Sequence, residues 1–286
     1  MKKIAVVNDL SGLGKCSLTA AIPVISAMGV QAVPLPTAIL SNQTGYPSYF
    51  CDDYTDKMDA IMEEWEKRGF SPDGIYTGFL AGEKQAGKVL DFFRRFCRQD
   101  TLVLVDPVMG DQGRAYDIYT EGLRQKMADL AARAHVITPN LTEALLLLYG
   151  KKGMEEKYCR LGQATGKAYL EEIQEQGRKL LEKFGLQACV VTGVEYEDGV
   201  LQIGNLVCEA SRCSWFFTEK TGGSYSGTGD LFASVLSAGL VQGFSMEDCV
   251  KKAVRFLSKA IRDAAAEGTD RNDGVCFEPY LHELWD

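Results

Sequence analysis

Histidine is almost absent from this chain of 286 residues, which has only His135 and His282. His135 lies in the run AHVITP, a pattern typical of a strand edge. Zinc hydrolases and Ser-His-Asp enzymes use histidine as a metal ligand or as a general base. The sequence therefore argues against both classes of enzyme.

The chain also lacks paired cysteines and long apolar runs. Its nine cysteines are odd in number and scattered, and none form C-x-x-C, so neither a disulfide framework nor a zinc knuckle is indicated. The amino terminus MKKIAVVNDLSG has a short apolar run that Asn8 and Asp9 interrupt, unlike a signal peptide or a membrane span. We expect a cytoplasmic protein that does not bind membranes.

The chain has fewer basic than acidic residues. It contains 31 Lys and Arg and 39 Asp and Glu, which gives a net charge of −8. This balance argues against a nucleic-acid surface, which needs a basic stripe to neutralise phosphates.

The familiar nucleotide-binding loops are also missing from the sequence. The stretch SGLGKCS does not match the Walker pattern, because Gly12 and Gly14 are too close together and Cys16 stands where that pattern has a hydroxyl residue. It does not match the dinucleotide-binding pattern G-x-G-x-x-G either, because the third glycine is missing.

What the chain does contain is an alternation of strand and helix patterns. Helical periodicity follows the apolar runs, as at Met58, Ile61, Met62 and Trp65, which fall at i, i+3, i+4 and i+7. This alternation predicts an α/β fold with a mostly parallel central sheet and helices on both faces. The predicted parallel strands are 3–8, 31–38, 74–78, 101–106, 135–139 and 188–193.

The pattern changes in the last third of the chain. Residues 199–210 and 213–220 are predicted to form antiparallel edge strands, and two helices at about 228–242 and 246–267 close the chain. No repeat or linker divides the sequence, so we predict a single domain over 1–286. Two polar, glycine-containing segments remain, 110–120 and 151–167. We predict a mobile flap for the former and a mobile excursion between helices for the latter.

Polar segments follow each predicted strand, where ligands bind in parallel α/β sheets. Acids, amides, hydroxyls and glycines are therefore expected to gather at one rim of the sheet. The segments are NDLSGLGKCS, SNQTGY, GFLAG, DPVMGDQG, PNLTEA and TGVE.

The stretch SGTGDLFAS combines a loop with the start of an apolar helix. Gly227, Thr228 and Gly229 would bring backbone amides to the helix amino terminus, where the helix dipole favours an anion such as a transferred phosphoryl group. Asp230, in the first turn, would accept the proton of the attacking hydroxyl. Alternatively, Ser226 or Thr228 caps the helix and Asp230 only complements its dipole. This segment alone leaves both interpretations open.

Four further residues supply oxygen atoms suited to a hydrated Mg²⁺ ion on nucleotide phosphates. They are Asp106 and Asp111 in DPVMGD, and Asn140 and Glu143 in PNLTEA. Taken singly, Asp106 is also typical of a strand end, and PNLTEA of a helix start with an acidic first turn. Together with the SGTGD stretch they indicate a kinase active site.

The ordered set SNQTGY, DPVMGD, ITPNLTEA, VVTG and SGTGDLFAS covers nearly the whole chain. It resembles the vitamin-kinase branch of the ribokinase superfamily, and within it the pyridoxal kinases most closely. The resemblance implies a ribokinase-like fold, ATP as co-substrate, Mg²⁺, a monovalent cation such as K⁺, and a homodimer. It also implies that Asp230 is the catalytic base and that the preceding G-T-G forms the anion hole.

The resemblance assigns roles to further residues. It places substrate contacts at Ser11, Thr44 and Phe79, where relatives often carry tyrosine instead of this phenylalanine. Glu143 and Asp111 are assigned to Mg²⁺, and Thr138 and Thr192 to the monovalent cation. The implied ATP contacts are Asp106, Asn140, Thr192, Gly193, Tyr225 and Thr228.

Three functions follow as expectations. The first is ATP-dependent phosphorylation of the 5′-hydroxymethyl group of pyridoxal, pyridoxamine or pyridoxine. The second is the related reaction on hydroxymethylpyrimidine, whose kinases are similar in fold and core. The third, a non-catalytic small-molecule binding protein, is disfavoured because the acidic set and Asp230 are all present.

Overall fold

The computed structural model describes residues 1–285 and forms two compact units. The first unit contains residues 1–102 together with the C-terminal part of the chain from residue 221, and the second contains 103–220. None of the helices in the described residues is both long and apolar enough to cross a membrane.

The first unit is built on four strands in the order β4-β1-β2-β3. β1 pairs in parallel with β2 and β4, and β3 is antiparallel to β2. Residues 4–7 of β1 have no exposed surface, as expected for a strand covered by helices on both faces. The strands are β1 (Lys3–Leu13), β2 (Gln31–Asn42), β3 (Cys51–Asp53) and β4 (Gly74–Thr77).

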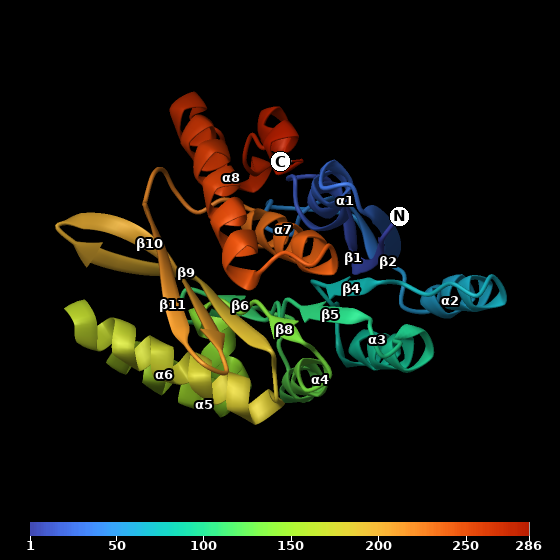
Figure 1. Cartoon of the computed structure of the whole chain (residues 1–286), viewed down its shortest axis with the longest axis horizontal. Helices are drawn as coiled ribbons and strands as arrows, with labels where there is room; N and C mark the ends of the chain where they lie inside the picture. Colours follow the sequence, from blue (N-terminus) through green and yellow to red (C-terminus); the bar gives the residue numbers. More distant parts are fainter. Residues whose placement is uncertain (286) are drawn as a thin grey trace. The chain divides into compact units, whose positions relative to one another are not determined.

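Helices cover both faces of these strands, with α1, α7 and α8 on one side and α2 and α3 on the other (Figure 1). α7 is the central helix, because residues 231–239 are all buried and it contacts α1, α8 and β4. The helices are α1 (Ser17–Ala27), α2 (Met58–Lys67), α3 (Glu83–Phe96), α7 (Thr228–Val241) and α8 (Met246–Glu267). Two 3₁₀ helices follow, η1 (Arg271–Asp273) and η2 (Glu278–Leu284).

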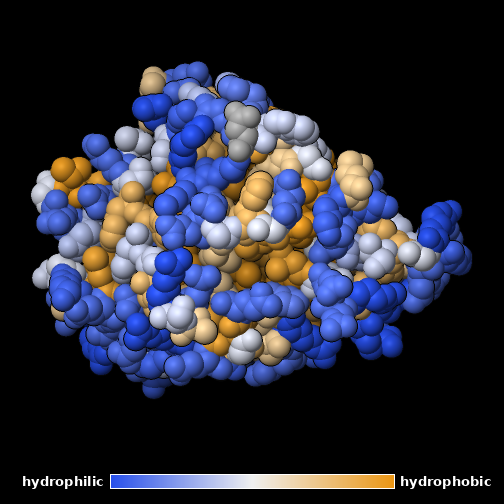
Figure 2. Space-filling view, in the orientation of Figure 1, coloured by the Kyte–Doolittle hydropathy of each residue, from blue (hydrophilic) through white to orange (hydrophobic). Residues whose placement is uncertain are grey.

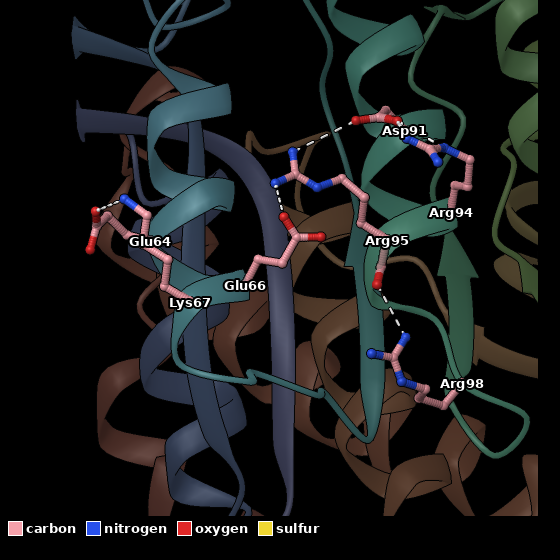
Figure 3. A network of polar contacts seen from close by, with 7 residues as sticks. All are labelled: Glu64, Glu66, Lys67, Asp91, Arg94, Arg95 and Arg98. Carbon is pink, nitrogen blue, oxygen red and sulfur yellow. Dashed lines mark hydrogen bonds and ion pairs between the residues drawn. The ribbon is translucent and has the colours of Figure 1, made fainter.

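An aromatic cluster joins α2 to α3. Phe92 and Phe96 stack at 4.7 Å between ring centroids, and Trp65 meets both rings edge-on. Around this cluster, Arg95 of α3 reaches Glu66 of α2 with a nitrogen to oxygen distance of 2.8 Å (Figure 3). The half-buried Trp65 therefore packs its ring against α3.

The second unit has five strands in the order β5-β8-β9-β10-β11. β5, β8 and β9 are parallel, and the long β9–β10–β11 segment is antiparallel, which confirms the predicted antiparallel edge strands. A separate hairpin is formed by β6 and β7. The strands are β5 (Leu102–Val105), β6 (Gly110–Asp111), β7 (Arg114–Ala115), β8 (Val136–Ile137), β9 (Ala188–Asp198), β10 (Val200–Glu209) and β11 (Cys213–Glu219).

The segment 151–167, predicted as a mobile excursion between helices, is instead mostly helical. α5 (Leu141–Leu161) bends at Gly150, where φ is 69°, and continues as helix, and α6 (Gly166–Phe184) follows after a short turn. Met154 and Leu161 are buried, while the Lys and Glu residues around them face outward. Figure 2 shows this mostly hydrophilic surface over α5 and α6, at the lower left. Lys and Glu are good helix formers, so polarity alone did not indicate a loop.

The segment 110–120 begins with a regular hairpin. β6 and β7 are joined by Gln112 and Gly113, both with positive φ (49° and 74°), as in a tight two-residue hairpin turn. Gly113 donates its amide to the Thr142 hydroxyl at 2.8 Å. α4 (Glu121–Ala131) begins just beyond, with Thr120 as its side-chain cap. Closure of this hairpin over a substrate stays a prediction.

Phe96→Ala tests the aromatic cluster. Phe96 is 1% exposed, so its truncation leaves a cavity between α2 and α3. We expect the free energy of unfolding, measured by urea titration, to fall by about 3–5 kcal/mol. Arg94→Ala on the exposed side of the same helix is the control, with an expected change within about 0.5 kcal/mol. A loss below about 1 kcal/mol in Phe96→Ala would contradict this role for the cluster.

Candidate active site

Asp230 is the centre of a hydrogen-bond network in the first unit. Its Oδ2 accepts a hydrogen bond from the Ser17 amide at 2.8 Å. Its Oδ1 accepts from Asn8 Nδ2 at 2.9 Å and from the Tyr76 hydroxyl at 3.2 Å. Three elements distant in sequence, β1, the start of α1 and β4, therefore fix the orientation of this carboxylate.

The amino terminus of α7 has no side-chain cap. Gly227 is the N-cap residue, and the Thr228 hydroxyl donates instead to the Tyr225 carbonyl oxygen at 3.1 Å. The capping interpretation, with Ser226 or Thr228 as the cap, is therefore wrong. The first N–H groups of a helix have no partner within the helix, so the amides of Thr228 and Gly229 are suited to an anionic ligand.

Gly227 is required by the close approach of two segments. Its φ is 78°, and a Cβ atom there would lie 2.1 Å from the carbonyl oxygen of Lys15. Lys15 and Ser17 also have positive φ, 48° and 52°, which is uncommon for residues other than glycine. This strained turn before α1 brings the Ser17 amide to Asp230. Backbone strain of this kind often marks a functional site.

Asp9 also stabilises the turn before α1, through hydrogen bonds to its carboxylate. It is 4% exposed, and its two carboxylate oxygens accept hydrogen bonds from the hydroxyls of Ser11 (2.7 Å) and Ser17 (2.6 Å). Burial raises the pKa of Asp9, and these two hydrogen bonds oppose the rise. Asp9 therefore helps to fix Ser17, whose amide reaches Asp230.

Burial raises the pKa of Asp230 to about 6. That value already includes a smaller rise from the negative charge of Asp9, and the hydrogen bonds from Ser17, Asn8 and Tyr76, which favour the charged form, keep the pKa from rising higher. A carboxylate with a pKa near 6 is still ionised at neutral pH and is more basic than an ordinary aspartate. The site therefore has the properties of a general base.

Sequence reasoning missed Asn8, Asp9 and Tyr76 as parts of this network. Asn8 also accepts an amide hydrogen bond from Phe79, at 3.0 Å, and so links β1 to the segment after β4. The available signal was the pair Asn8-Asp9 inside an otherwise apolar strand, because buried polar residues need partners. Tyr76 gave no such signal, since it resembles any core residue of a buried strand.

The three predicted substrate residues also lie in the first unit. The Ser11 side chain is buried against Asp9, and Phe79 is half-buried just beyond β4. Thr44 is exposed, in the turn that follows β2. β2 is longer than predicted and includes the first two residues of SNQTGY.

In the second unit, Glu143 ties the start of α5 to the segment after β5. Its carboxylate accepts hydrogen bonds from the amides of Met109 (3.1 Å) and Asn140 (2.9 Å), and the Asn140 side chain accepts from the Glu143 amide at 3.0 Å. This reciprocal pair is a capping box. The helix-start interpretation of PNLTEA is therefore confirmed, and a role at the metal stays a prediction.

Acidic side chains lie close together around Glu143. Burial raises the pKa of Glu143 well above its ordinary value, and the charges of Asp106 and Asp111 raise it further. Mutual repulsion of this kind suits a site that receives a cation. In residues 1–285, however, no three His, Cys, Asp or Glu side chains are placed to hold a metal ion by themselves.

The remaining predicted residues of the second unit lie next to this acidic set. Asn140 forms an isolated parallel bridge with Thr192, whose amide donates to the Pro139 carbonyl at 2.9 Å. Gly193 follows with φ of 68°. The Thr138 hydroxyl is buried and has no hydrogen-bond partner. Such an orphaned oxygen fits the predicted monovalent cation.

The predicted residues thus form two sets, one in each unit. Tyr225 and Thr228, which we expected at the nucleotide, belong to the first unit. The first set is Ser11, Thr44, Phe79, Tyr225, Gly227, Thr228, Gly229 and Asp230. The second is Asp106, Asp111, Thr138, Asn140, Glu143, Thr192 and Gly193.

Comparison with known proteins gives a consistent result. A family model described as phosphomethylpyrimidine kinase matches residues 14–274. The pyridoxine/pyridoxal/pyridoxamine kinase of Bordetella avium (strain 197N) is 30% identical over 250 residues, which are 84% of this chain and 78% of that protein.

Solved structures agree in fold over the whole chain. A candidate phosphomethylpyrimidine kinase from Bacteroides thetaiotaomicron VPI-5482, crystallised with pyridoxal, has a TM-score of 0.89 and 38% identity, covering 99% of this chain and 95% of that one. Pyridoxal kinase from Lactobacillus plantarum has a TM-score of 0.83 and 27% identity, covering 99% and 96%. The predicted ribokinase-like fold and the resemblance to the pyridoxal kinases are confirmed.

Tyr76→Phe tests the electrostatics of the Asp230 network. The variant removes a hydrogen bond that favours the charged carboxylate, so we expect the pKa of Asp230 to rise. A hydrogen bond to a charged group contributes about 1.5–3 kcal/mol, and the low end corresponds to about one pKa unit. The measurement is a ¹³C NMR titration of the Asp230 carboxyl carbon, whose signal is assigned by its loss in Asp230→Asn.

Tyr280→Phe is the matched control, because the Tyr280 hydroxyl donates to Asp263, another aspartate of the first unit. This control should leave the titration of Asp230 unchanged. If the pKa of Asp230 stays constant or falls in Tyr76→Phe, the network does not act on the carboxylate as described.

Proposed function

Because the chain belongs to the phosphomethylpyrimidine kinase family, we propose that it transfers the γ-phosphoryl group of ATP to the 5′-hydroxymethyl group of a vitamin B6 vitamer. Pyridoxal, pyridoxamine and pyridoxine all carry this group. The observation that carries the proposal is Asp230, held by three hydrogen bonds at the uncapped amino terminus of α7.

The relatives favour a B6 vitamer over a pyrimidine. The Bordetella avium relative is named for three vitamers, and the Bacteroides structure, with 38% identity, was crystallised with pyridoxal. Hydroxymethylpyrimidine stays the alternative substrate because the matching family model carries that description. Ser11, Thr44 and Phe79 are the residues that we assign to the ring.

Asp230 acts as the general base in this proposal. Its carboxylate accepts the proton of the substrate hydroxyl while the oxygen attacks the γ-phosphorus and the bond to the ADP leaving oxygen breaks. The amides of Thr228 and Gly229 stabilise the negative charge of the transferred phosphoryl group, since they point out of the helix amino terminus. Ser17, Asn8 and Tyr76 keep the carboxylate oriented.

The second unit supplies the residues that we assign to the nucleotide and its cations. Asn140, Thr192 and Gly193 would contact phosphates, and Asp106, Asp111 and Glu143 would attract Mg²⁺. Glu143 already accepts two amide hydrogen bonds, so its charge would act on an ion that keeps most of its water ligands. When bound, Mg²⁺ neutralises phosphate charge. The buried Thr138 hydroxyl, with Thr192, fits K⁺.

Three expectations about the whole protein remain predictions. They are a single functional domain, a homodimer and a cytoplasmic location. The family model supports the first, because its match of residues 14–274 includes parts of both units.

Asp230→Asn is the direct test of the proposed reaction. The amide is nearly isosteric but poorly basic, so we expect kcat for pyridoxal to fall by about 10²–10⁴-fold while ATP affinity changes only a few-fold. In the wild type, kcat/KM should fall as the pH drops through about 6, because protonated Asp230 cannot accept the substrate proton. Coupled detection of ADP, with phosphorylated product identified by mass spectrometry, measures both.

Asp100→Asn, in an exposed turn of the same unit, is the matched control and should keep normal activity. The assay compares the three B6 vitamers with hydroxymethylpyrimidine side by side. Efficient turnover of the pyrimidine with none of the vitamers would refute the proposed substrate. An Asp230→Asn enzyme that keeps most of its kcat would refute the proposed base.

Thr138→Val tests the proposed cation site. The substitution replaces the orphaned hydroxyl by a methyl group of similar size, so the fold should persist. We expect turnover with Mg²⁺ and ATP to rise several-fold when K⁺ is added to the wild type, and this activation to disappear in the variant. Equal activation by K⁺ in both proteins would exclude Thr138, and full activity in excess chelator would exclude a requirement for Mg²⁺.

A further inference from the structure

The tip of the β10–β11 hairpin brings two cysteines together. Cys208 is the last but one residue of β10, Cys213 is the first residue of β11, and the two are register partners. Their Sγ atoms are 2.7 Å apart. This separation is close for two thiols and only slightly longer than a disulfide bond, which is about 2.05 Å.

The hairpin geometry permits a bond between them. Glu209 and Arg212 exchange both backbone hydrogen bonds (2.9 and 3.3 Å), so the next pair inward, Cys208 and Cys213, is a non-hydrogen-bonded pair. The Cα atoms of such a pair lie about 4.5 Å apart, within the range that disulfides span. No rearrangement of the strands is therefore needed.

The surroundings give the two thiols different roles. Cys213 is half-buried, and the Arg178 side chain donates from Nε to its Sγ at 3.4 Å. Cys208 is fully buried beneath α6, where Gly177 makes room for it, because a Cβ at Gly177 would lie 2.8 Å from the Cys208 Sγ. Cys213 is thus the accessible thiol, beside a positive charge, and Cys208 lies behind it.

We propose that Cys208 and Cys213 form a thiol pair that reacts with small-molecule disulfides, such as glutathione disulfide, and becomes a reversible intramolecular disulfide. This site is independent of the proposed phosphoryl transfer. It involves no residue of the Asp230 network.

The reaction takes place in two exchange steps that balance. The Cys213 thiolate attacks one sulfur of the small disulfide, a mixed disulfide forms, and one thiolate leaves. The Cys208 sulfur then loses its proton to solvent and attacks the Cys213 sulfur, which releases the second small thiolate. The protein loses two electrons and two protons, and the small disulfide is reduced to two thiols. Arg178 favours the first step because its charge stabilises a thiolate.

Burial raises the pKa of Cys208, so its deprotonation is unfavourable at neutral pH. The adjacent position of the two sulfur atoms offsets this, because the second step is intramolecular. A metal site is not indicated at this pair, since no third His, Cys, Asp or Glu among residues 1–285 joins it.

The test is incubation of the whole protein with glutathione disulfide, followed by tryptic mapping without reduction. Trypsin cleaves after Arg212, between the two cysteines, so the expected product is peptide 184–212 linked to peptide 213–220. Fragmentation must place the link on Cys208, since Cys189 lies in the same peptide. Added dithiol should restore the free peptides.

Variants separate the two steps. Cys208→Ser should keep a stable glutathione adduct on Cys213, and Cys213→Ser should leave Cys208 unmodified. Arg178→Gln should slow the loss of free Cys213 several-fold, whereas Lys179→Gln, on the same helix, should not. The exposed Cys159 serves as an internal control, because a lone thiol should stop at the mixed disulfide.

Two results would overturn the proposal. One is a wild-type protein that keeps glutathione on Cys213 without forming the internal link. The other is a Cys208–Cys213 pair that stays reduced while Cys159 reacts. Both results are read from the wild-type protein, so they do not depend on the folding of any variant.

Discussion

The contact between the start of α7 and the turn before α1 is the constraint on which the first unit depends. Gly227 lies so close to the Lys15 carbonyl that no side chain fits between the two segments. The same contact delivers the Ser17 amide to Asp230 and leaves the α7 amides without a side-chain cap. The proposed base and the proposed anion-binding helix terminus therefore depend on the same packing contact, which the buried body of α7 holds in place.

Asp230 also shows how burial and hydrogen bonding set the chemistry of one group. Burial alone would favour a neutral carboxyl group, and the nearby charge of Asp9 adds to that tendency. Three donors oppose it, and the resulting pKa of about 6 leaves the group charged but basic at neutral pH. Asp9 contributes at a distance, because its hydrogen bonds to Ser11 and Ser17 shape the turn that carries one of the three donors.

The second unit uses local structure for two purposes. Glu143 completes a capping box with Asn140, and it also brings a third carboxyl group near Asp106 and Asp111. The structural and functional interpretations of PNLTEA are therefore compatible. The β10–β11 hairpin also has two effects. Its tight turn joins the two antiparallel strands, and it places Cys208 beside Cys213.

The sequence by itself determined the strand and helix alternation, the antiparallel edge strands, and the limits of α7 and α8 nearly to the residue, because these depend on local periodicity and turn residues. It also pointed to Asp230, since glycines beside an acid at a helix start are visible in one short stretch. Only the tertiary structure decided the partners of Asp230, because Asn8, Ser17 and Tyr76 lie 222, 213 and 154 positions away. The helical 151–161 segment was missed because its buried residues are few, and the cysteine pair because its contact depends on strand register. Contacts of this kind depend on how the strands and helices pack, so they cannot be inferred from a local sequence pattern.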